Sequence, residues 1–409
     1  MEILIIHPNF PGQFRNLAAS LVRMPGMKVF GLGDAEWTSD IPQVEGVKLL
    51  TYPAPAKPEN KDALHPYVRR YDEFVRRGVQ AINTLSAYKV DLYLEPDVII
   101  VHPGFGDGLF LKDLFPATRI IGLFEFYYSR YGADVGFDPE FPANLNDIFR
   151  VRALNAAQLM ALDCCDIGIS PTQWQRSRFP EVWQQKLQVL HEGIDTKRVA
   201  PNPAASVQLK DGTVLRAGDE VLTYVGRCLE PYRGYHIFMR ALPAILAARP
   251  NCHVVIVGAD KLGYGTSPPK GTTFREHYLA EVQGRLDMSR VHYAGALVYD
   301  DFIRVLQISR VHAYLTSPFV LSWSMMEAMS AGCLVLGSAT PPVEELIRDG
   351  ENGLLFPFHS PQALADRAID ALANPQRYQR LRSAARQTII DHYDFETKTL
   401  PAYLRLLHP

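Results

Sequence analysis

The sequence has few cysteines and almost no net charge, and each of these features counts against some classes of protein. Its 409 residues include five cysteines, an odd number, and no two of them have C-x-x-C spacing. Free cysteines in apolar runs behave as small hydrophobic residues, so a reducing compartment fits best. The formal net charge at pH 7 is −2, so no overall field favours nucleic acid or an anionic membrane. We expect a cytoplasmic protein that does not bind nucleic acid.

Several motifs of metal and nucleophile chemistry are also missing. The sequence contains no Asp-x-Asp pair, no H-E-x-x-H and no Cys/His cluster, so we predict no metal site and no cofactor. The absence of G-x-S-x-G and G-x-x-x-x-G-K-[ST] counts against α/β-hydrolase and P-loop chemistry. The opening "MEILII" is too short for a signal peptide or a membrane span, and we interpret it as a first strand.

What the sequence does have is a regular alternation of short apolar runs with helical patterns. The runs span 2–7, 27–33, 46–52, 97–103, 119–126 and 166–171 in the first half, and 221–227, 253–260, 291–297, 311–317, 333–338 and 353–358 in the second. Such alternation predicts an α/β fold of parallel, doubly wound sheets whose ligands gather at the carboxyl ends of the strands.

A break at 198–220, rich in Pro, Ala and polar residues, separates the two halves. The length of the chain also favours two hydrophobic cores over one. We therefore predict two Rossmann-like domains, residues 1–200 and 201–385. The loops after His7, His102, Glu125 and Ser170 should then open at one edge of the first sheet.

Two arginines flank a predicted helix start in "VGRCLEPYRGYHIFMRALPAIL". Arg227 ends a strand and Arg233 precedes the helix that begins near Gly234. Forked guanidinium donors beside a helix N-terminus suit a diphosphate. Two solvated surface arginines would fit the spacing equally well.

Glu327 is the only acid in "SPFVLSWSMMEAMSAG", and an acid in such surroundings needs a partner. In the first turns of a helix after a strand, its carboxylate could accept hydrogen bonds from both hydroxyls of a ribose. The alternative is a residue that merely complements the helix dipole, a contribution of about 0.3–1 kcal/mol.

The order of these segments resembles a known family. "VGR…RG", "VGAD", "VHYAGALVYDDF", "SPF…MMEAMSAG" and "PVEELIRDGENGLLF" follow one another as in the C-terminal domain of family 4 glycosyltransferases with the GT-B fold. The resemblance covers about residues 220–375 and extends more weakly to "HPNFPGQFRNLA" near the N-terminus. It implies that the final segment, 386–409, crosses back to the first domain.

The resemblance also assigns roles to individual residues. The family pattern E-x7-E places the ribose-binding acid at Glu327 and the sugar-binding acid at Phe319, where the acid is lost. Gly226 and Val298 fall in the donor-binding segments, and the amides of Val320, Leu321 and Ser322 could still donate to the sugar or a phosphate. In the first half, Gly12 matches a Gly-containing loop, and Glu125 stands where many members have a His near the reacting sugar.

The function implied by the resemblance is a retaining, metal-independent transfer of a sugar. A nucleoside diphosphate sugar would be the donor, and a hydroxyl of a saccharide, lipid-linked or other acceptor would receive the sugar. Arg227, Arg233 and Glu125 are the predicted catalytic residues, the arginines stabilising the leaving diphosphate. The family suggests surface polysaccharide or glycoconjugate assembly. A nucleotide-sugar epimerase and a binding module without turnover are the alternatives.

Three further features can each be interpreted as structural or as functional. His102 in "VHPGFGDG" either contacts the donor or acceptor or holds a turn, and His191 in "LHEGID" is better explained as structural. The residues Arg69, Arg70, Arg76 and Arg77 recur at helical spacing. We interpret them as a solvated face, while peripheral contact with a lipid-linked acceptor at the inner face of a membrane stays open.

Overall fold

The computed structural model describes residues 1–58 and 60–408 and divides the chain into two compact units. Unit 1 contains Met1–Val135, Ala143–Gly193 and 395–408, and unit 2 contains Gly136–Pro142 and Ile194–Asp394. The chain thus changes unit at Gly193 rather than at the predicted residue 200, because the Pro-rich break folds into unit 2 as a hairpin of β8 (Ser206–Gln208) and β9 (Val214–Arg216).

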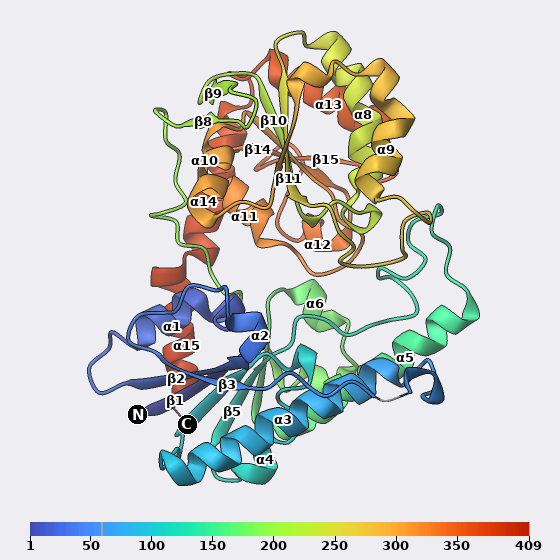
Figure 1. Cartoon of the computed structure of the whole chain (residues 1–409). Coiled ribbons are helices and arrows are strands. Elements are labelled where there is room, and N and C mark those ends of the chain that lie inside the picture. The colour runs from blue at the N-terminus through green and yellow to red at the C-terminus, as the bar shows by residue number, and fades with distance from the viewer. Residues whose placement is uncertain (59, 409) are drawn as a thin grey trace. The chain divides into compact units, whose positions relative to one another are not determined.

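Unit 1 is built on a parallel sheet of seven strands in the order β3-β2-β1-β4-β5-β6-β7 (Figure 1). The strands are β1 (Glu2–Ile6), β2 (Lys28–Asp34), β3 (Lys48–Tyr52), β4 (Val98–Val101), β5 (Arg119–Leu123), β6 (Ile167–Ser170) and β7 (Leu187–Val189). Six of them are the predicted apolar runs. The seventh, β7, is three residues long and has one buried side chain, so its sequence carries no strand signal.

Helices cover both faces of this sheet, as a doubly wound fold requires. They are α1 (Arg15–Leu21), α2 (Ala35–Thr38), α3 (Arg69–Asp91), α4 (Leu111–Leu114), α5 (Leu145–Cys164), α6 (Gln173–Ser177), α7 (Glu181–Gln184) and α15 (Leu400–Leu407). The α5 helix begins with a capping box, in which Asn144 accepts from the amide of Asp147 and the Asp147 side chain accepts from that of Asn144. The last helix, α15, buries Tyr403 and Leu407 in the core of unit 1.

Unit 2 repeats this plan with six parallel strands in the order β12-β11-β10-β13-β14-β15. The strands are β10 (Val221–Cys228), β11 (His253–Ala259), β12 (Val291–Gly295), β13 (Val311–Tyr314), β14 (Leu334–Ser338) and β15 (Leu354–Phe356), all of them predicted runs. The helices are α8 (Tyr235–Ala248), α9 (Phe274–Val282), α10 (Tyr299–Ile308), α11 (Trp323–Ser330), α12 (Pro341–Glu344), α13 (Pro361–Ala373) and α14 (Gln379–Tyr393).

Two apolar cores lie on opposite faces of the second sheet. Side chains of α8, α9 and α13 form one, and side chains of α10, α11 and α14 form the other (Figure 1). The five cysteines are free and buried. Among residues 1–58 and 60–408, none of the helices has both the length and the apolar character needed to cross a bilayer.

Candidate active site

Each sheet has one point where the strand order reverses, and several of the predicted site residues follow the strands on either side of it. In unit 1 the reversal falls between β1 and β4, and in unit 2 between β10 and β13. Ligands of open parallel sheets bind beyond the carboxyl ends of the strands at such points. His7 and His102 directly follow β1 and β4, while Arg227 lies near the end of β10. Each unit therefore has a candidate site at its own sheet edge.

The site of unit 1 is centred on Glu125, two residues after β5. Nε2 of His102 lies 2.9 Å from Oε2 of Glu125, and the Gln13 amide donates to Oε1 at 3.1 Å. The amide of Gly104 donates to Nδ1 of His102, so Nε2 is the ring nitrogen that carries a proton toward the carboxylate. Both carboxylate oxygens are thus fixed by side chains from other loops.

These contacts keep Glu125 ionised. Its partial burial, with 23% of the side chain exposed, would raise its pKa, but the charge and hydrogen bond of His102 and the hydrogen bond of Gln13 outweigh burial and lower the pKa to about 2. At neutral pH the group is therefore an anion and an acceptor of hydrogen bonds. With such a pKa it is a weak base.

Gly12 and His191 pack closely around this site. Gly12 has φ +49°, and a Cβ there would lie 2.7 Å from the ring of His7, so only glycine fits this turn. His191 is buried and accepts the amide hydrogen of Gly193 at Nδ1, and burial lowers its pKa to about 4. This neutral, hydrogen-bonded ring agrees with the structural role expected for His191.

In unit 2 the two predicted arginines have different surroundings. Arg227 is exposed and lies in a bulge, where the register between β10 and β11 shifts between Val225 and Cys228. Gly226 occupies the same bulge, and a Cβ there would come within 2.9 Å of the Cys228 carbonyl oxygen. A bulge re-aims the side chains beside it, and here it leaves Arg227 exposed near the carboxyl end of its strand.

Arg233 is anchored to the loop that follows β13. Its Nη1 donates to Oγ1 of Thr316 at 2.8 Å and to the carbonyl of Val320 at 2.9 Å. The guanidinium carbon lies 5.5 Å from the ring centroid of Phe319. Arg233 is therefore held in one orientation beside the segment that contains the predicted sugar-binding position.

Glu327 lies in the second turn of α11 and is only 4% exposed. Its Oε1 accepts a hydrogen bond of 2.7 Å from the hydroxyl of Tyr299, at the start of α10. A surface acid that only complements a helix dipole would be neither so buried nor so fixed. The structure thus places a buried carboxylate in α11, downstream of the β13 loop.

The amides predicted to meet a ligand are not equivalent. The amide of Ser322 donates to the hydroxyl of Tyr314 at 2.8 Å, and its side chain caps α11 by accepting from the amide of Ser324. Ser322 is therefore engaged within the protein, and Val320 and Leu321 stay as the predicted amide donors. Val298 is 70% exposed at the N-cap of α10.

Two family models match the chain, one in each half. Residues 26–199 match the glycosyl transferase family 4 group, and residues 208–388 match glycosyl transferases group 1. A solved structure of Anabaena HepE in complex with UDP and glucose superimposes over 100% of this chain and 99% of its own, with a TM-score of 0.68 and 15% sequence identity. This chain has the GT-B fold, and each of its two halves matches a glycosyltransferase domain family. The predicted fold class is confirmed.

Curated relatives of these glycosyltransferase domains are distant. Spore coat protein SA of Bacillus subtilis is 24% identical over 234 residues, which are 54% of this chain and 58% of that protein. D-inositol 3-phosphate glycosyltransferase of Mycolicibacterium gilvum is 26% identical over 181 residues, 44% of this chain and 38% of that protein. The chain spans about half the length of these relatives.

Several residues that support the candidate sites of the two domains were not predicted from the sequence. Gln13 and Tyr299 hold the two key carboxylates, yet polar and aromatic residues of this kind occur throughout the chain. Glu230 lies between the two arginines of "RCLEPYRG" and is 1% exposed, and its Oε2 accepts the amide hydrogens of Gly263 and Tyr264. A lone acid between two site arginines was the available signal for Glu230.

The arginines of α3 divide into two kinds. Three pair with acids at the surface, as a solvated face predicts: Arg69 with Asp62, Arg70 with Glu73 and Arg76 with Asp72. Arg77 is instead buried and donates to Oδ2 of Asp34 at 2.7 Å, and its guanidinium lies over the ring of Trp37. The prediction that Arg77 lies on a solvated face was wrong, because α3 turns this residue toward the end of β2.

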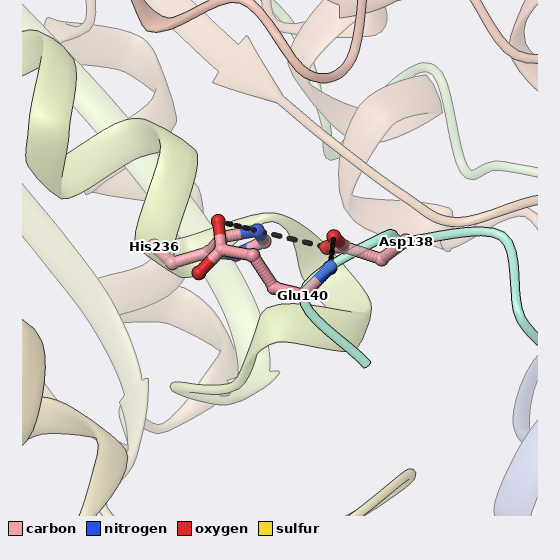
Figure 2. Close-up of side chains that lie close together, drawn as sticks. All are labelled: Asp138, Glu140 and His236. Carbon is pink, nitrogen blue, oxygen red and sulfur yellow. Dashed lines mark hydrogen bonds and ion pairs between the residues drawn. The ribbon is translucent and has the colours of Figure 1, made fainter. Parts of the chain in front are cut away.

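Unit 2 also contains a cluster of possible metal ligands, shown in Figure 2. Nε2 of the buried His236 lies 2.9 Å from Oδ2 of Asp138 and 3.9 Å from Oε1 of Glu140. Both oxygens of Glu140 already accept from the guanidinium of Arg240. A metal ion would have to displace that cation, so the arrangement fits better as a clamp that fixes 136–142 to the start of α8.

Aromatic contacts support the clamp. Phe137 lies 5.1 Å from Phe358, and Phe141 lies 6.4 Å from Phe274, measured between ring centroids. Glu140 and Phe141 also line a cavity of about 410 Å³ together with α9 and the loop before it. Burial opposes ionisation of Asp138, but the hydrogen bond of His236 is among the contacts that lower its pKa overall. The segment 136–142 therefore docks through both charge and apolar contact.

Proposed function

We propose that this protein transfers a sugar from a nucleoside diphosphate sugar to an acceptor hydroxyl. One observation carries the proposal: Arg227, the anchored Arg233 and the buried Glu327 accompany the strand-order reversal in the group 1 domain. Two cations and one carboxylate correspond to the two parts of a nucleoside diphosphate, its charged phosphates and its ribose diol. The complex of HepE with UDP and glucose gives further support.

In the proposed reaction the arginines stabilise the departing diphosphate. The bond between the anomeric carbon and the diphosphate oxygen breaks, and negative charge grows on a group that guanidinium donors hold. The acceptor oxygen forms the new bond on the same face, which retains the anomeric configuration, as the family resemblance implies. No metal ion is required in this scheme, because the arginines and helix-end amides compensate the charge.

Glu125 has a different proposed task in unit 1. With a pKa of about 2 it is too weak a base to remove a proton from an alcohol. It acts instead as a fixed anion that accepts a hydroxyl hydrogen bond and stabilises positive charge, with His102 and Gln13 holding its orientation. The acceptor proton then leaves with an oxygen of the departing diphosphate.

The acceptor and the setting are proposed more broadly. We infer a saccharide, a lipid-linked sugar or another hydroxyl compound as acceptor, in the cytoplasm and in the assembly of a surface polysaccharide or glycoconjugate. Three arginines of α3 are paired with acids, which weakens any attraction to an anionic membrane. Peripheral contact at the inner face of the membrane thus has less support than a freely diffusing acceptor.

A donor panel read by mass spectrometry tests the proposal. The protein is incubated with UDP-, GDP-, ADP- and dTDP-sugars and a mixture of acceptor alcohols, and a new glycoside is the expected product. An isomerised donor would instead show an epimerase. Saturable binding without either product would show a binding module, the rival that the replacement of an acid by Phe319 favours. The matched control is Arg216→Ala, an exposed arginine on β9.

A further inference from the structure

Three aromatic rings gather around the position where the family resemblance expects an acid. The ring centroid of Phe319 lies 5.0 Å from that of Tyr232 and 5.1 Å from that of Tyr264, and the two tyrosine rings stack 5.5 Å apart. Phe319 is 4% exposed, whereas both tyrosines are half-buried. We call these three residues the aromatic wall. Its accessible surface is formed by the tyrosines, with Phe319 behind them.

The aromatic wall is built from three separate segments, and Glu230 holds two of them together. Tyr232 belongs to the turn Pro231–Arg233, Phe319 to the loop after β13, and Tyr264 to the loop after β11. Oε2 of the buried Glu230 accepts the amide hydrogens of Gly263 and Tyr264 at 2.7 and 2.8 Å. A Cβ on Gly263 would lie 3.2 Å from Oε1 of this carboxylate, so glycine permits the close approach.

Arg233 connects the aromatic wall to the proposed diphosphate site. Its guanidinium contacts Phe319 at 5.5 Å and donates to Thr316 and Val320. A sugar attached to a diphosphate held by Arg233 would therefore meet the wall. Tyrosine rings present apolar faces to such a sugar, with polar atoms only at the hydroxyl end.

We propose that the aromatic wall contacts the donor sugar and selects a deoxy sugar, and that Glu230 is the positioning residue that sets Tyr264. This rests on the proposed function. Carbon–hydrogen surface packs well on an aromatic ring, whereas a hydroxyl turned toward it loses a hydrogen bond to water without replacement. Where the family has an acid that accepts a hydrogen bond from a sugar hydroxyl, this chain has aromatic rings. These rings favour a sugar that lacks that hydroxyl.

The test compares a nucleoside diphosphate hexose with its four deoxy analogues, modified at carbon 2, 3, 4 or 6. We expect kcat/KM for one deoxy donor to exceed that of the parent by about tenfold. An apolar site rejects an added hydroxyl by no more than about 100-fold, which bounds the effect. Equal use of the parent and all four analogues would overturn the proposal.

Substitutions in the aromatic wall show whether it is the source of the preference. Tyr264→Asn supplies a polar group at a half-buried position and should cut the deoxy-to-parent ratio about tenfold. Phe319→Leu keeps the apolar volume and should preserve at least half of the ratio. Affinity for the nucleoside diphosphate alone, measured by calorimetry, should change less than threefold in both. An unchanged ratio in Tyr264→Asn would show that the preference arises elsewhere.

Glu230 is tested by rescue. Glu230→Ala should raise KM for the deoxy donor about tenfold with little change in kcat, while Glu230→Gln, which retains a carbonyl acceptor, should restore most of the affinity. Similar kinetics for Ala and Gln would contradict the positioning role.

Failure of the proposed function can be told apart from failure of this inference. If no donor yields a glycoside, calorimetry with the parent and deoxy donors still measures the preference in binding. A deoxy preference without turnover supports the aromatic wall and contradicts the transferase. Turnover with a preference for the parent hexose supports the transferase and contradicts the aromatic wall.

Discussion

The carboxyl edges of the two sheets share a topology but differ in chemistry. In unit 1 the strand reversal is surrounded by histidines and by Glu125, whose two oxygens are fixed by His102 and Gln13. In unit 2 the reversal carries Arg227 in a bulge and Arg233 in a turn. An arginine keeps its charge throughout the physiological range, whereas a histidine can lose its charge there.

The difference shows how one fold can support two different binding tasks. An edge of permanent cations suits a ligand that is always anionic, such as a diphosphate. An edge with a fixed anion and histidines suits hydroxyl groups and developing positive charge. The same doubly wound topology therefore supports opposite electrostatics, because side chains at strand ends change without disturbing the strands.

Removing the cations of unit 2 should have the largest effect. We expect Arg233→Ala to cut turnover by about 10- to 100-fold, since a charge-assisted contact contributes about 1.5–3 kcal/mol and the bonds to Thr316 and Val320 are lost as well. Arg227→Ala should cost about tenfold. Steady-state kinetics and circular dichroism measure activity and folding.

Arg233→Lys sharpens this comparison, because it keeps the charge and loses the fork. We expect it to recover part of the activity, while the control Arg216→Ala stays at the wild-type level. Unchanged kinetics in Arg227→Ala and Arg233→Ala would contradict the proposed diphosphate site in unit 2.

Neutralising Glu327 should have an effect of similar size, measured on nucleotide affinity rather than on turnover. Glu327→Gln can still accept from Tyr299, but one end of its amide is a donor, so nucleotide affinity should fall by about 1.5–3 kcal/mol. Calorimetry with a nucleoside diphosphate and its 2′,3′-dideoxy analogue measures this loss. Equal losses for both ligands would assign Glu327 to structure rather than to the ribose.

Glu125 should show the pH dependence that the cations of unit 2 lack. Its pKa is lowered from 4.5 to about 2 in the folded protein, so its ionised form stabilises the fold above pH 4.5. This contribution is lost as the pH falls from 4.5 toward 2. The stability advantage of the wild type over Glu125→Gln should be on the order of 2 kcal/mol at pH 7 and shrink over that window.

Chemical denaturation between pH 7 and 3 follows this difference, and turnover of Glu125→Gln should be about tenfold lower at pH 7. His102→Gln is the companion variant, because it removes a major opposing contact that keeps the pKa low. A stability difference that does not vary with pH would show that the contacts with His102 and Gln13 do not lower the pKa of Glu125.

Removing metal should have the smallest effect, because arginines rather than a metal ion stabilise the leaving group in the proposed reaction. Activity should survive EDTA within about twofold. Complete loss that magnesium or manganese restores would contradict metal independence. Asp138→Asn and His236→Gln would then identify whether the cluster of Figure 2 is the metal site.

Much of the fold could be predicted because its signals are local. Each of the twelve predicted strands is a short apolar run, and burial on both faces of a parallel sheet requires such a run. The hairpin of β8 and β9 was missed because its strands are three residues long and mostly exposed. Arg227, Arg233 and Glu327 could be nominated because strand ends and helix starts are readable from the same pattern.

The sequence by itself determined the alternation of strands and helices, the two domains and the charged residues at strand ends. Only the tertiary structure decided which of these residues meet. Glu125 contacts Gln13 across 112 positions, Glu230 holds Tyr264 across 34, and Asp138, which comes from the first half of the sequence, contacts His236 within unit 2. Periodicity follows from backbone geometry within a few residues, whereas such contacts depend on how whole elements pack, which no local pattern encodes.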